Sequence, residues 1–368
     1  MIKAFNDIYM NRRVLITGHT GFKGSWLTMW LLSLGAKVTG YSLYLPSRPS
    51  NFGECKLGDH INHITGDVRD LKRLNAVFEK YKPELVFHLA AQPIVKKSFE
   101  DPKLTFDTNA GGTVNVLECL RKSESAKAAV IITSDKCYKN QESGKGYKET
   151  DMLGGDDPYS ASKACAEIIA NSYIRSFFND AKYVRISTVR AGNVIGGGDW
   201  AADRIVPDCI RAFSSNKVVT LRNPKSTRPW QHVLEPLSGY LWLGAKLYLS
   251  RNFHGEAFNF GPDENVDKSV QEVVTKLSEY WGKGKWRIDK NKRFGKETHL
   301  LKLSCEKSLK LIGWRPTLTF DETIEKTAQW YKKYYDGKND MFAYSLKQIN
   351  LYSEEAFSKG ALWTKRVK

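Results

Sequence analysis

The chain has 368 residues, of which 41% are hydrophobic and 12% aromatic; this suffices for one large core or two smaller ones and excludes a largely disordered chain. Its longest apolar stretches, such as Trp26–Leu34, are far shorter than the ~20 residues of a membrane span, and residues 1–10 contain no apolar signal segment. The formal net charge of +17 attracts anions, and its densest basic run, residues 283–296, is interpreted as a solvated surface loop.

The first half of the chain predicts an alternation of strands and helices. Strands are expected over short β-branched runs, namely Arg13–Thr17, Ala36–Leu43, Ile61–Val68, Glu84–Ala91, Ala128–Thr133 and Tyr183–Arg190. Helices are expected over the longer amphipathic runs Ser25–Leu34, Leu71–Tyr81, Leu104–Arg121 and Tyr159–Phe178. This rhythm is typical of an α/β fold with a doubly wound parallel sheet of the Rossmann type.

The rhythm ends after the glycines at positions 196–198. We therefore expect a first domain over residues 1–195, a smaller mixed domain over 196–335 and a C-terminal extension over 336–368 without an assigned role. The segment Leu221–Pro229 is expected to be a loop. A helix over Glu235–Ser250 and a strand over Glu256–Phe260 are expected to pack back on the first domain.

A glycine-rich segment, Thr17–Gly24, follows the first strand. Gly18 permits a tight turn, Gly21 lets the backbone approach a pyrophosphate, and Gly24 lets the following helix lie close to the strand. Because the glycines lie between a strand and a helix, the segment predicts a dinucleotide site in the first domain.

The acidic residue that usually binds the ribose is missing. It is expected at the end of the second strand, about 20 residues after the glycines, but that strand ends in the residues GYSL at 40–43. Ser42 and the backbone remain as ribose ligands, and Arg48 is a possible partner for a 2′-phosphate, so NADP stays open beside NAD. Asp67 and Val68, after the third strand, are expected near the adenine.

Tyr159 and Lys163 are four residues apart and share one helix face. A neighbouring cation lowers the pKa of a phenol from about 10, which makes tyrosine a usable base at neutral pH. Ser134, at the end of the fifth strand, provides the hydroxyl that accompanies such a pair. Asp135 and Lys136 follow it at the strand end, where ligands bind in parallel sheets, and are expected to face the same substrate.

These motifs resemble the extended short-chain dehydrogenase/reductase family, and within it the nucleotide-sugar 4,6-dehydratases that act on CDP-glucose. The phrases that carry the resemblance are TGHTGFKG (17–24), LAAQ (89–92), TSDKCY (133–138), RAGNVIGGGDWA (190–201), RIVPD (204–208) and TRPWQHVLEPLSGYL (227–241). The resemblance extends from about Arg13 to Tyr334. It implies NAD as cofactor, CDP-glucose as the small-molecule partner, and a homodimer or homotetramer built on the helices Leu104–Arg121 and Tyr159–Phe178.

The resemblance also implies roles for the catalytic residues. Ser134 orients the carbon-4 hydroxyl, Tyr159 is the base for hydride transfer, and Lys163 tunes Tyr159 and holds the nicotinamide ribose. Asp135 protonates the leaving carbon-6 hydroxyl. The dTDP-glucose enzymes carry Glu where this chain has Lys136, which is either the base for the carbon-5 proton or a cation that stabilises the enolate; the sequence leaves both roles open.

The binding residues implied by the resemblance fall into two groups. The cofactor group comprises Gly18, His19, Gly21, Phe22, Gly24, Asp67, Val68, Leu89, Ala90 and Ala91, together with Tyr159 and Lys163. The substrate group comprises Gln92, Asn193, Arg204, Arg228 and His232.

Other functions are less consistent with these residues. A nucleotide-sugar epimerase needs no acid and cation beyond the Tyr159/Lys163 pair, so Asp135 and Lys136 argue against it. A regulator that only binds NAD(P) needs none of the catalytic groups. No nucleic-acid-binding motif is present, and neither nucleic acid nor membrane is expected as a partner. The six cysteines form no C-x-x-C pair, which favours reduced thiols in the cytoplasm and no metal site.

Overall fold

The computed structural model describes residues 4–141, 144–180, 184–221, 223–263, 267–288 and 301–364. Some features of the sequence prediction fall partly outside these ranges. They are residues 289–296 of the basic run, Tyr183 of the sixth predicted strand, Arg222 of the predicted loop and residues 365–368 of the C-terminal extension.

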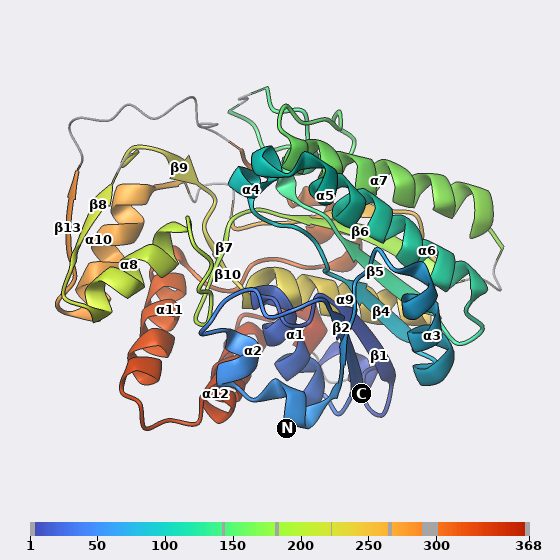
Figure 1. Ribbon diagram of the computed structural model, residues 1–368, viewed down its shortest axis with the longest axis horizontal. Coiled ribbons are helices and arrows are strands. Elements are labelled where there is room, and N and C mark those ends of the chain that lie inside the picture. Colours follow the sequence, from blue (N-terminus) through green and yellow to red (C-terminus); the bar gives the residue numbers. More distant parts are fainter. Residues whose placement is uncertain are drawn as a thin grey trace.

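A parallel sheet forms the centre of the protein (Figure 1). Within the described residues it has seven strands in the spatial order β11, β6, β5, β4, β1, β2, β3, and every neighbouring pair is parallel. Their bounds are β1 Arg13–Thr17, β2 Lys37–Ser42, β3 Asn62–Thr65, β4 Leu85–His88, β5 Ala128–Ile132, β6 Arg185–Ala191 and β11 Ala257–Phe260. The strand order reverses between β1 and β4, which is where ligands bind in doubly wound sheets.

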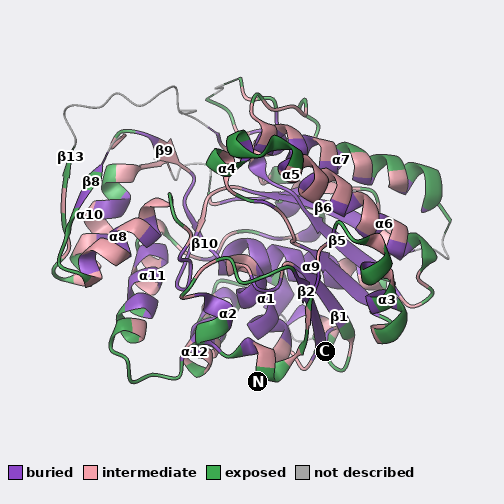
Figure 2. Cartoon of the chain, viewed as in Figure 1, coloured by how far each residue is buried: buried purple, intermediate pink, exposed green. Residues whose placement is uncertain are grey.

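Helices cover both faces of this sheet, and the buried residues gather between the layers (Figure 2). One face packs against α3 Leu71–Tyr81, α6 Gly112–Lys122 and α7 Pro158–Phe177. The other packs against α1 Phe22–Ser33 and α9 Leu234–Leu249, with α12 Met341–Ser358 lying on α1. No described helix is long and apolar enough to cross a membrane.

The remaining elements lie mostly to one side of the sheet, around α10 (Figure 1). Their bounds are α8 Ile205–Ser214, β8 Val218–Leu221, α10 Val270–Trp281, β13 Lys285–Ile288 and α11 Phe320–Tyr335. The short α-helices and strands are α2 Asn51–Glu54, α4 Val95–Glu100, α5 Pro102–Phe106, β7 Val194–Ile195, β9 Thr227–Arg228, β10 Gln231–His232 and β12 Lys268–Ser269. The division into domains at residue 195 stays a prediction, although α9 and β11 are part of the sheet layers.

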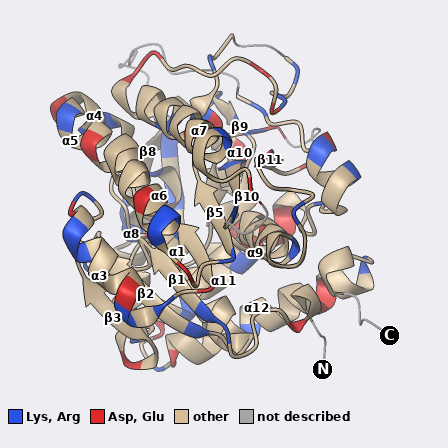
Figure 3. Cartoon of the chain, turned by 90° about the vertical axis from the view of Figure 1, so that its right-hand side faces the viewer, with Lys and Arg blue, Asp and Glu red and all other residues tan. Residues whose placement is uncertain are grey.

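Charged side chains are interspersed over the helices. In the view of Figure 3, Lys and Arg lie beside Asp and Glu on α3 and on α4 and α5. Several of these contacts are short-range pairs within one helix or turn, such as Lys103 with Asp107 and Arg121 with Glu118. Such pairs locally balance part of the net positive charge.

Most of the predicted elements have different bounds in the structure, usually by one to three residues at an end. The first helix begins at Phe22, three residues before the expected Ser25, because Gly21 is its N-cap. The expected continuous helix Leu104–Arg121 is broken into α5 and α6 by a π-helical turn over Asp107–Gly111. The side chain of Asn109 lies in this turn and is buried, where it bonds to the backbone of Gln92 and to Ser162. The expected loop Leu221–Pro229 also contains the short strand β9.

The C-terminal helix α12 is anchored by a buried carboxylate. Glu235 of α9 accepts hydrogen bonds from the backbone N–H groups of Thr317 and Leu318 and from the Tyr352 hydroxyl of α12 at 2.9 Å. Burial raises the pKa of Glu235 to about 7 despite these donors. Trp363 also stacks on Phe5 with ring centroids 4.9 Å apart. The extension after residue 335 therefore belongs to the core of the protein.

Removal of the Tyr352 hydroxyl is expected to destabilise the protein. In Tyr352→Phe the buried Glu235 carboxylate loses a donor, which costs about 1.5–3 kcal/mol of unfolding free energy for a bond to a charged group. Urea denaturation measures this change. Tyr335→Phe is the matched control, because Tyr335 is 42% exposed, and it should change stability by less than about 0.5 kcal/mol. Equal effects of the two variants would contradict the anchoring role.

Candidate active site

The glycine-rich turn between β1 and α1 has the shape that a dinucleotide requires. Gly18 has a φ of +78°, and a Cβ there would lie 2.6 Å from the backbone nitrogen of Ala90. A Cβ on Gly24 would overlap the Gly18 carbonyl, so the start of α1 lies directly on the turn. The first N–H groups of α1 therefore face the crevice between β1 and β4, where they can bind an anion.

The neighbouring loops complete this crevice. The N–H of Ala90, after β4, donates to the Thr17 hydroxyl at 3.3 Å, which places Leu89–Ala91 beside the glycine turn. Asp67 and Val68 follow β3. The Asp67 carboxylate is bonded to the Arg69 side chain, which lowers its pKa. Val68 is buried and its carbonyl accepts a bond from Asn115 of α6.

The His19 side chain is packed inside the protein. Its Nε2 lies 2.7 Å from Nδ1 of His63, and its ring lies against Gly40, where any Cβ would overlap it. Burial, with a contribution from His63, lowers the pKa of His19 to about 3. His19 therefore contributes its backbone, but not a charged ring, to the cofactor crevice.

The predicted catalytic residues lie together at the carboxyl edge of the sheet. The Ser134 hydroxyl donates to Asp135 Oδ1 at 2.9 Å, and the Lys136 ammonium lies 3.7 Å from the same oxygen. Tyr159, near the start of α7, lies close enough to Ser134 for that hydroxyl to act on its pKa. Ser134, Asp135 and Tyr159 are each less than 9% exposed, whereas the Lys136 side chain is 33% exposed. The strand end and the helix face thus form one buried cluster.

The expectation that a cation lowers the pKa of Tyr159 is wrong for the free protein. Burial raises this pKa to about 12 and outweighs the interaction with Ser134, which acts in the opposite direction. Burial also lowers the pKa of Lys163 to about 8, although the charge of Glu167 opposes this shift. Desolvation thus disfavours the charged form of both members of the pair.

A buried ion pair fixes α7 against the sheet. Glu167 of α7 pairs with Arg190 of β6 at 2.9 Å, and both side chains are 4% exposed. The same carboxylate accepts bonds from the hydroxyls of Thr133, which directly follows β5, and Thr188, in the middle of β6. Because Thr133 directly precedes Ser134, this pair sets the position of α7 relative to the catalytic strand end.

The five predicted substrate residues have different surroundings. The amide of Gln92 is engaged within the protein, with Thr105 and with the backbone of Ile94. Asn193 is half-buried beside β10, where its carbonyl accepts a bond from Gln231. Arg204 pairs with Asp199 at 2.9 Å, which raises its pKa, and its charge acts on Tyr159. Arg204 therefore adjoins the catalytic cluster.

Arg228 and His232 lie on the short strands β9 and β10. Arg228 donates to the carbonyl of Thr227 at 2.7 Å and is half-buried. His232 is fully buried next to Trp26, and burial lowers its pKa to about 3. Its Nε2 has no hydrogen-bond partner among the described residues.

The sequence analysis missed Lys23. This residue is the only charged one in α1, and its ammonium lies 6.0 Å from the centre of the Tyr240 ring. Burial lowers its pKa to about 8, and the charges of Asp135, Arg204, Lys163 and Lys136 also act on it. The sequence did contain a signal for this residue, namely a single lysine in an otherwise apolar helix. Such a helix has no solvated face for the charge, so the lysine indicates a functional site.

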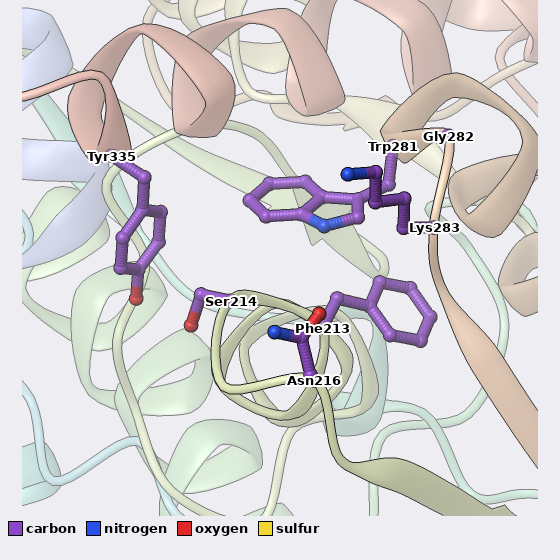
Figure 4. A pocket seen from close by; sticks show the side chains of 7 residues that line it. All are labelled: Phe213, Ser214, Asn216, Trp281, Gly282, Lys283 and Tyr335. Atoms are coloured by element: carbon purple, nitrogen blue, oxygen red, sulfur yellow. The ribbon is translucent and has the colours of Figure 1, made fainter.

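Two open hollows in the described part of the structure lie away from this cluster. Figure 4 shows one of them, of about 380 Å³, with Phe213 and Trp281 on one side and Tyr335 on the other. Another, of about 810 Å³, is lined by residues of α10 and α11. No group of three or more potential metal ligands lies together in the described part of the chain.

Breaking the buried pair is expected to cost far more than breaking an exposed one. Glu167→Gln leaves the Arg190 charge buried without a counter-ion, which should lower the unfolding free energy by about 3–5 kcal/mol. Urea denaturation measures the loss. The control is Asp107→Asn, which removes the exposed pair with Lys103 and should cost about 1 kcal/mol or less. A small loss in Glu167→Gln would refute the anchoring role of the pair.

Comparison with known proteins agrees with this arrangement. A CDP-glucose 4,6-dehydratase of Salmonella typhimurium is 46% identical over 351 residues, which are 94% of this chain and 97% of the relative. A UDP-glucose 4-epimerase of Mycolicibacterium smegmatis is 25% identical over 87% of this chain and 98% of its own. Both relatives align with most of this chain, but their names describe different reactions.

Solved structures also match over most of the chain. An epimerase from Methanothermobacter thermautotrophicus superposes with a TM-score of 0.78 at 24% identity, covering 90% of this chain and 95% of its own. A UDP-glucose 4-epimerase of Thermus thermophilus in complex with NAD superposes with a TM-score of 0.72 at 25% identity, covering 87% and 99%. The family model described as GDP-mannose 4,6 dehydratase matches residues 15–327. The chain therefore belongs to the GDP-mannose 4,6-dehydratase family of nucleotide-sugar enzymes.

Proposed function

We propose that this protein is an NAD-dependent CDP-glucose 4,6-dehydratase that produces CDP-4-keto-6-deoxyglucose. The observation that carries the proposal is the buried cluster of Ser134, Asp135, Lys136 and Tyr159, which holds an acid and a cation in addition to the residues of hydride transfer. The 46% identity to a relative named for this activity supports the choice of substrate.

The residues at the crevice fit a dinucleotide. The turn at Gly18 has no room for a side chain, the N-terminus of α1 faces the crevice, and the buried ammonium of Lys163 borders the catalytic cluster. Gly18, Gly21 and Phe22 would hold the pyrophosphate, while Leu89–Ala91 and Lys163 would hold the nicotinamide ribose. When bound, NAD accepts the hydride from carbon 4 of the sugar and returns it to carbon 6.

Tyr159 and Ser134 act on the carbon-4 hydroxyl. Tyr159 takes its proton as the carbon becomes a ketone, and the Ser134 hydroxyl orients the oxygen. Because burial raises the pKa of Tyr159 to about 12, the phenolate must be favoured by the positive groups around it, among them Arg204. The new ketone acidifies the proton on carbon 5.

Asp135 and Lys136 supply the acid and the base of the elimination. They are an ion pair at 3.7 Å, so a proton that passes from Lys136 to Asp135 yields a neutral amine and a neutral carboxyl group. The amine takes the carbon-5 proton, and the carboxyl group gives its proton to the carbon-6 hydroxyl, which leaves as water. The original ion pair is then restored. In the last step carbon 5 receives a proton. Tyr159 removed one proton from the carbon-4 hydroxyl in the first step, so the number of protons balances over the whole turnover.

We also propose that the protein self-associates in the cytoplasm. Ile168 and Phe177 of α7 are 57% and 45% exposed, which favours an interface on this helix together with α6. The six cysteines are all free, which is typical of a reducing compartment. Light scattering of the wild type and of Ile168→Glu tests the association, and the variant should shift toward the monomer.

Asp135→Asn should separate oxidation from elimination. Ser134, Tyr159 and Lys163 remain, so carbon 4 is still oxidised, but the carbon-6 hydroxyl lacks a proton donor and leaves slowly. Overall turnover should fall by about 10²–10⁴-fold, while reduced nicotinamide accumulates on the enzyme. Stopped-flow absorbance of the reduced nicotinamide measures this.

The controls for this experiment separate chemistry from folding. Asp208→Asn, on the exposed surface of α8, should turn over like the wild type. Lys136→Arg keeps the positive charge but removes the amine that could accept a proton. If Lys136 removes the carbon-5 proton, this variant should turn over as slowly as Asp135→Asn. Normal turnover in Asp135→Asn, without reduced nicotinamide, would refute the dehydratase mechanism.

The substrate is tested with four nucleotide sugars. We expect the purified protein with NAD to convert CDP-glucose to a 4-keto product at least about tenfold faster than dTDP-, UDP- or GDP-hexoses, which corresponds to about 1.4 kcal/mol of discrimination. The 4-keto product is followed by its absorbance in alkali, with Tyr159→Phe as the inactive control. Faster turnover of another nucleotide sugar would overturn the substrate assignment and leave the reaction type in place.

A further inference from the structure

A buried histidine lies at the floor of the cofactor crevice. His88 is the last residue of β4 and is paired with Thr17, the last residue of β1, where the order of the strands reverses. Both residues are buried. Nδ1 of His88 lies 2.7 Å from the hydroxyl oxygen of Thr17, and Nε2 lies 3.2 Å from the hydroxyl oxygen of Thr113 on α6. The proposed chemistry does not use this ring.

The contacts around His88 determine the direction of each hydrogen bond. The Thr113 hydroxyl donates its only hydrogen to the carbonyl of Asn109 at 2.7 Å, so its oxygen accepts from the Nε2–H of His88. A neutral imidazole has one N–H, and Nδ1 therefore accepts from the Thr17 hydroxyl. The oxygen of that hydroxyl accepts from the N–H of Ala90 at 3.3 Å. The other tautomer would leave the Thr17 hydrogen without an acceptor among the described residues.

His88 stays neutral near pH 7. Burial lowers its pKa to about 3, and the charge of Lys163 acts in the same direction. Protonation would also turn Nδ1 into a second donor, and the bond from the Thr17 hydroxyl would be lost. The ring is therefore a fixed acceptor on one side and a fixed donor on the other, which makes it a structural link and not a proton-transfer group.

The hydrogen bonds continue from His88 to the catalytic face of α7. Asn109, whose carbonyl receives the bond from α6, lies in the π-helical turn, and its side-chain amide donates to the Ser162 hydroxyl at 2.9 Å. The Ser162 hydroxyl donates to the carbonyl of Tyr159 at 2.7 Å, and the next residue is Lys163. A buried path thus connects the loop after β4, through His88, with the start of α7.

This path joins the two groups that would hold the nicotinamide ribose, namely the loop Leu89–Ala91 and Lys163. Hydride transfer requires the reacting atoms to be held in a narrow range of positions, and a displacement of about 1 Å can cost about 10²-fold in rate. The turn with Asp135 and Lys136 is held by a separate contact, the bond from Arg190 to the hydroxyl at the end of that turn. The two halves of the site therefore have separate supports.

On the basis of the proposed function, we propose that His88 is a positioning residue for hydride transfer. It sets the separation between the loop after β4 and α7, and with it the geometry in which the hydride leaves carbon 4 of the sugar. It acts through the positions of Ala90 and Ser162, and no bond to His88 forms or breaks.

Oxidation of carbon 4 can be measured alone in the Asp135→Asn background, in which reduced nicotinamide accumulates. Stopped-flow absorbance at saturating NAD and CDP-glucose gives a rate constant and an amplitude. Loss of folded protein lowers only the amplitude, whereas a misplaced reacting group lowers the rate constant. We expect His88→Phe, which removes both hydrogen bonds, to lower the rate constant by about 10–100-fold. His88→Gln, whose amide can donate to Thr113 as Nε2 does, should have an intermediate rate constant.

A second variant and a control complete the test. Thr113→Val removes the hydroxyl between His88 and Asn109 at nearly constant volume, and it should also slow oxidation by about tenfold. His254→Phe is the control, because His254 accepts from the N–H of Ile186 near the start of β6, and it should keep the rate constant of the parent.

The outcomes separate the inference from the proposed function. Circular dichroism establishes which variants fold. An unchanged rate constant in folded His88→Phe, or in Thr113→Val if His88→Phe does not fold, would overturn the positioning role, whatever the amplitude. If the Asp135→Asn parent forms no reduced nicotinamide with CDP-glucose, the proposed function itself fails.

Discussion

The active site depends on the buried ion pair between Glu167 and Arg190. Its carboxylate joins α7 to the end of β5 and to the middle of β6 through the hydroxyls of Thr133 and Thr188. Arg190 in turn donates to the Tyr138 hydroxyl at 2.6 Å and lies over its ring. Tyr138 ends the turn that carries Asp135 and Lys136, so one interaction positions both halves of the catalytic cluster. A buried pair of this kind contributes little net stability, but losing either partner leaves an isolated charge.

Desolvation determines the electrostatics of the cluster. The charges of Lys163, Arg204 and the Asp135–Lys136 pair all act on Lys23, and burial lowers the pKa of both Lys23 and Lys163 to about 8. Charges in such a cluster interact more strongly than in water because solvent does not screen them. The surplus of positive charge suits a diphosphate substrate and a phenolate or enolate intermediate. It also explains how Tyr159 can act as a base although burial alone raises its pKa.

Much of the fold follows from local patterns in the sequence. The bounds of β1 and α3 were predicted to the residue, because β-branched runs and the Asp70 cap define them locally. The π-helical turn was not predicted. It depends on hydrogen bonds from Asn109 to Gln92 and Ser162, which lie elsewhere in the chain. The role of α12 was missed for the same reason, since its anchor Glu235 lies more than a hundred residues before Tyr352.

The catalytic cluster was predictable in composition but not in its energetics. Ser134, Asp135, Tyr159 and Lys163 follow from motif spacing, because strand ends and helix faces have fixed geometry. The pKa of Tyr159 was predicted in the wrong direction, since burial depends on the packed structure and not on spacing. The internal bonding of Gln92 and the burial of His232 were likewise invisible in the sequence. Lys23 required the tertiary structure, which brings α1 beside α9 and the catalytic strand end.

The central claim is that one site oxidises carbon 4, eliminates water and reduces carbon 6 with the same hydride. It is tested most directly with CDP-glucose that carries deuterium on carbon 4, by locating the label in the product by nuclear magnetic resonance. The account predicts that the deuterium moves to carbon 6 of the 4-keto-6-deoxy sugar within a single molecule. Deuterium retained on carbon 4 of an epimerised sugar, or transferred to free cofactor in solution, would contradict it.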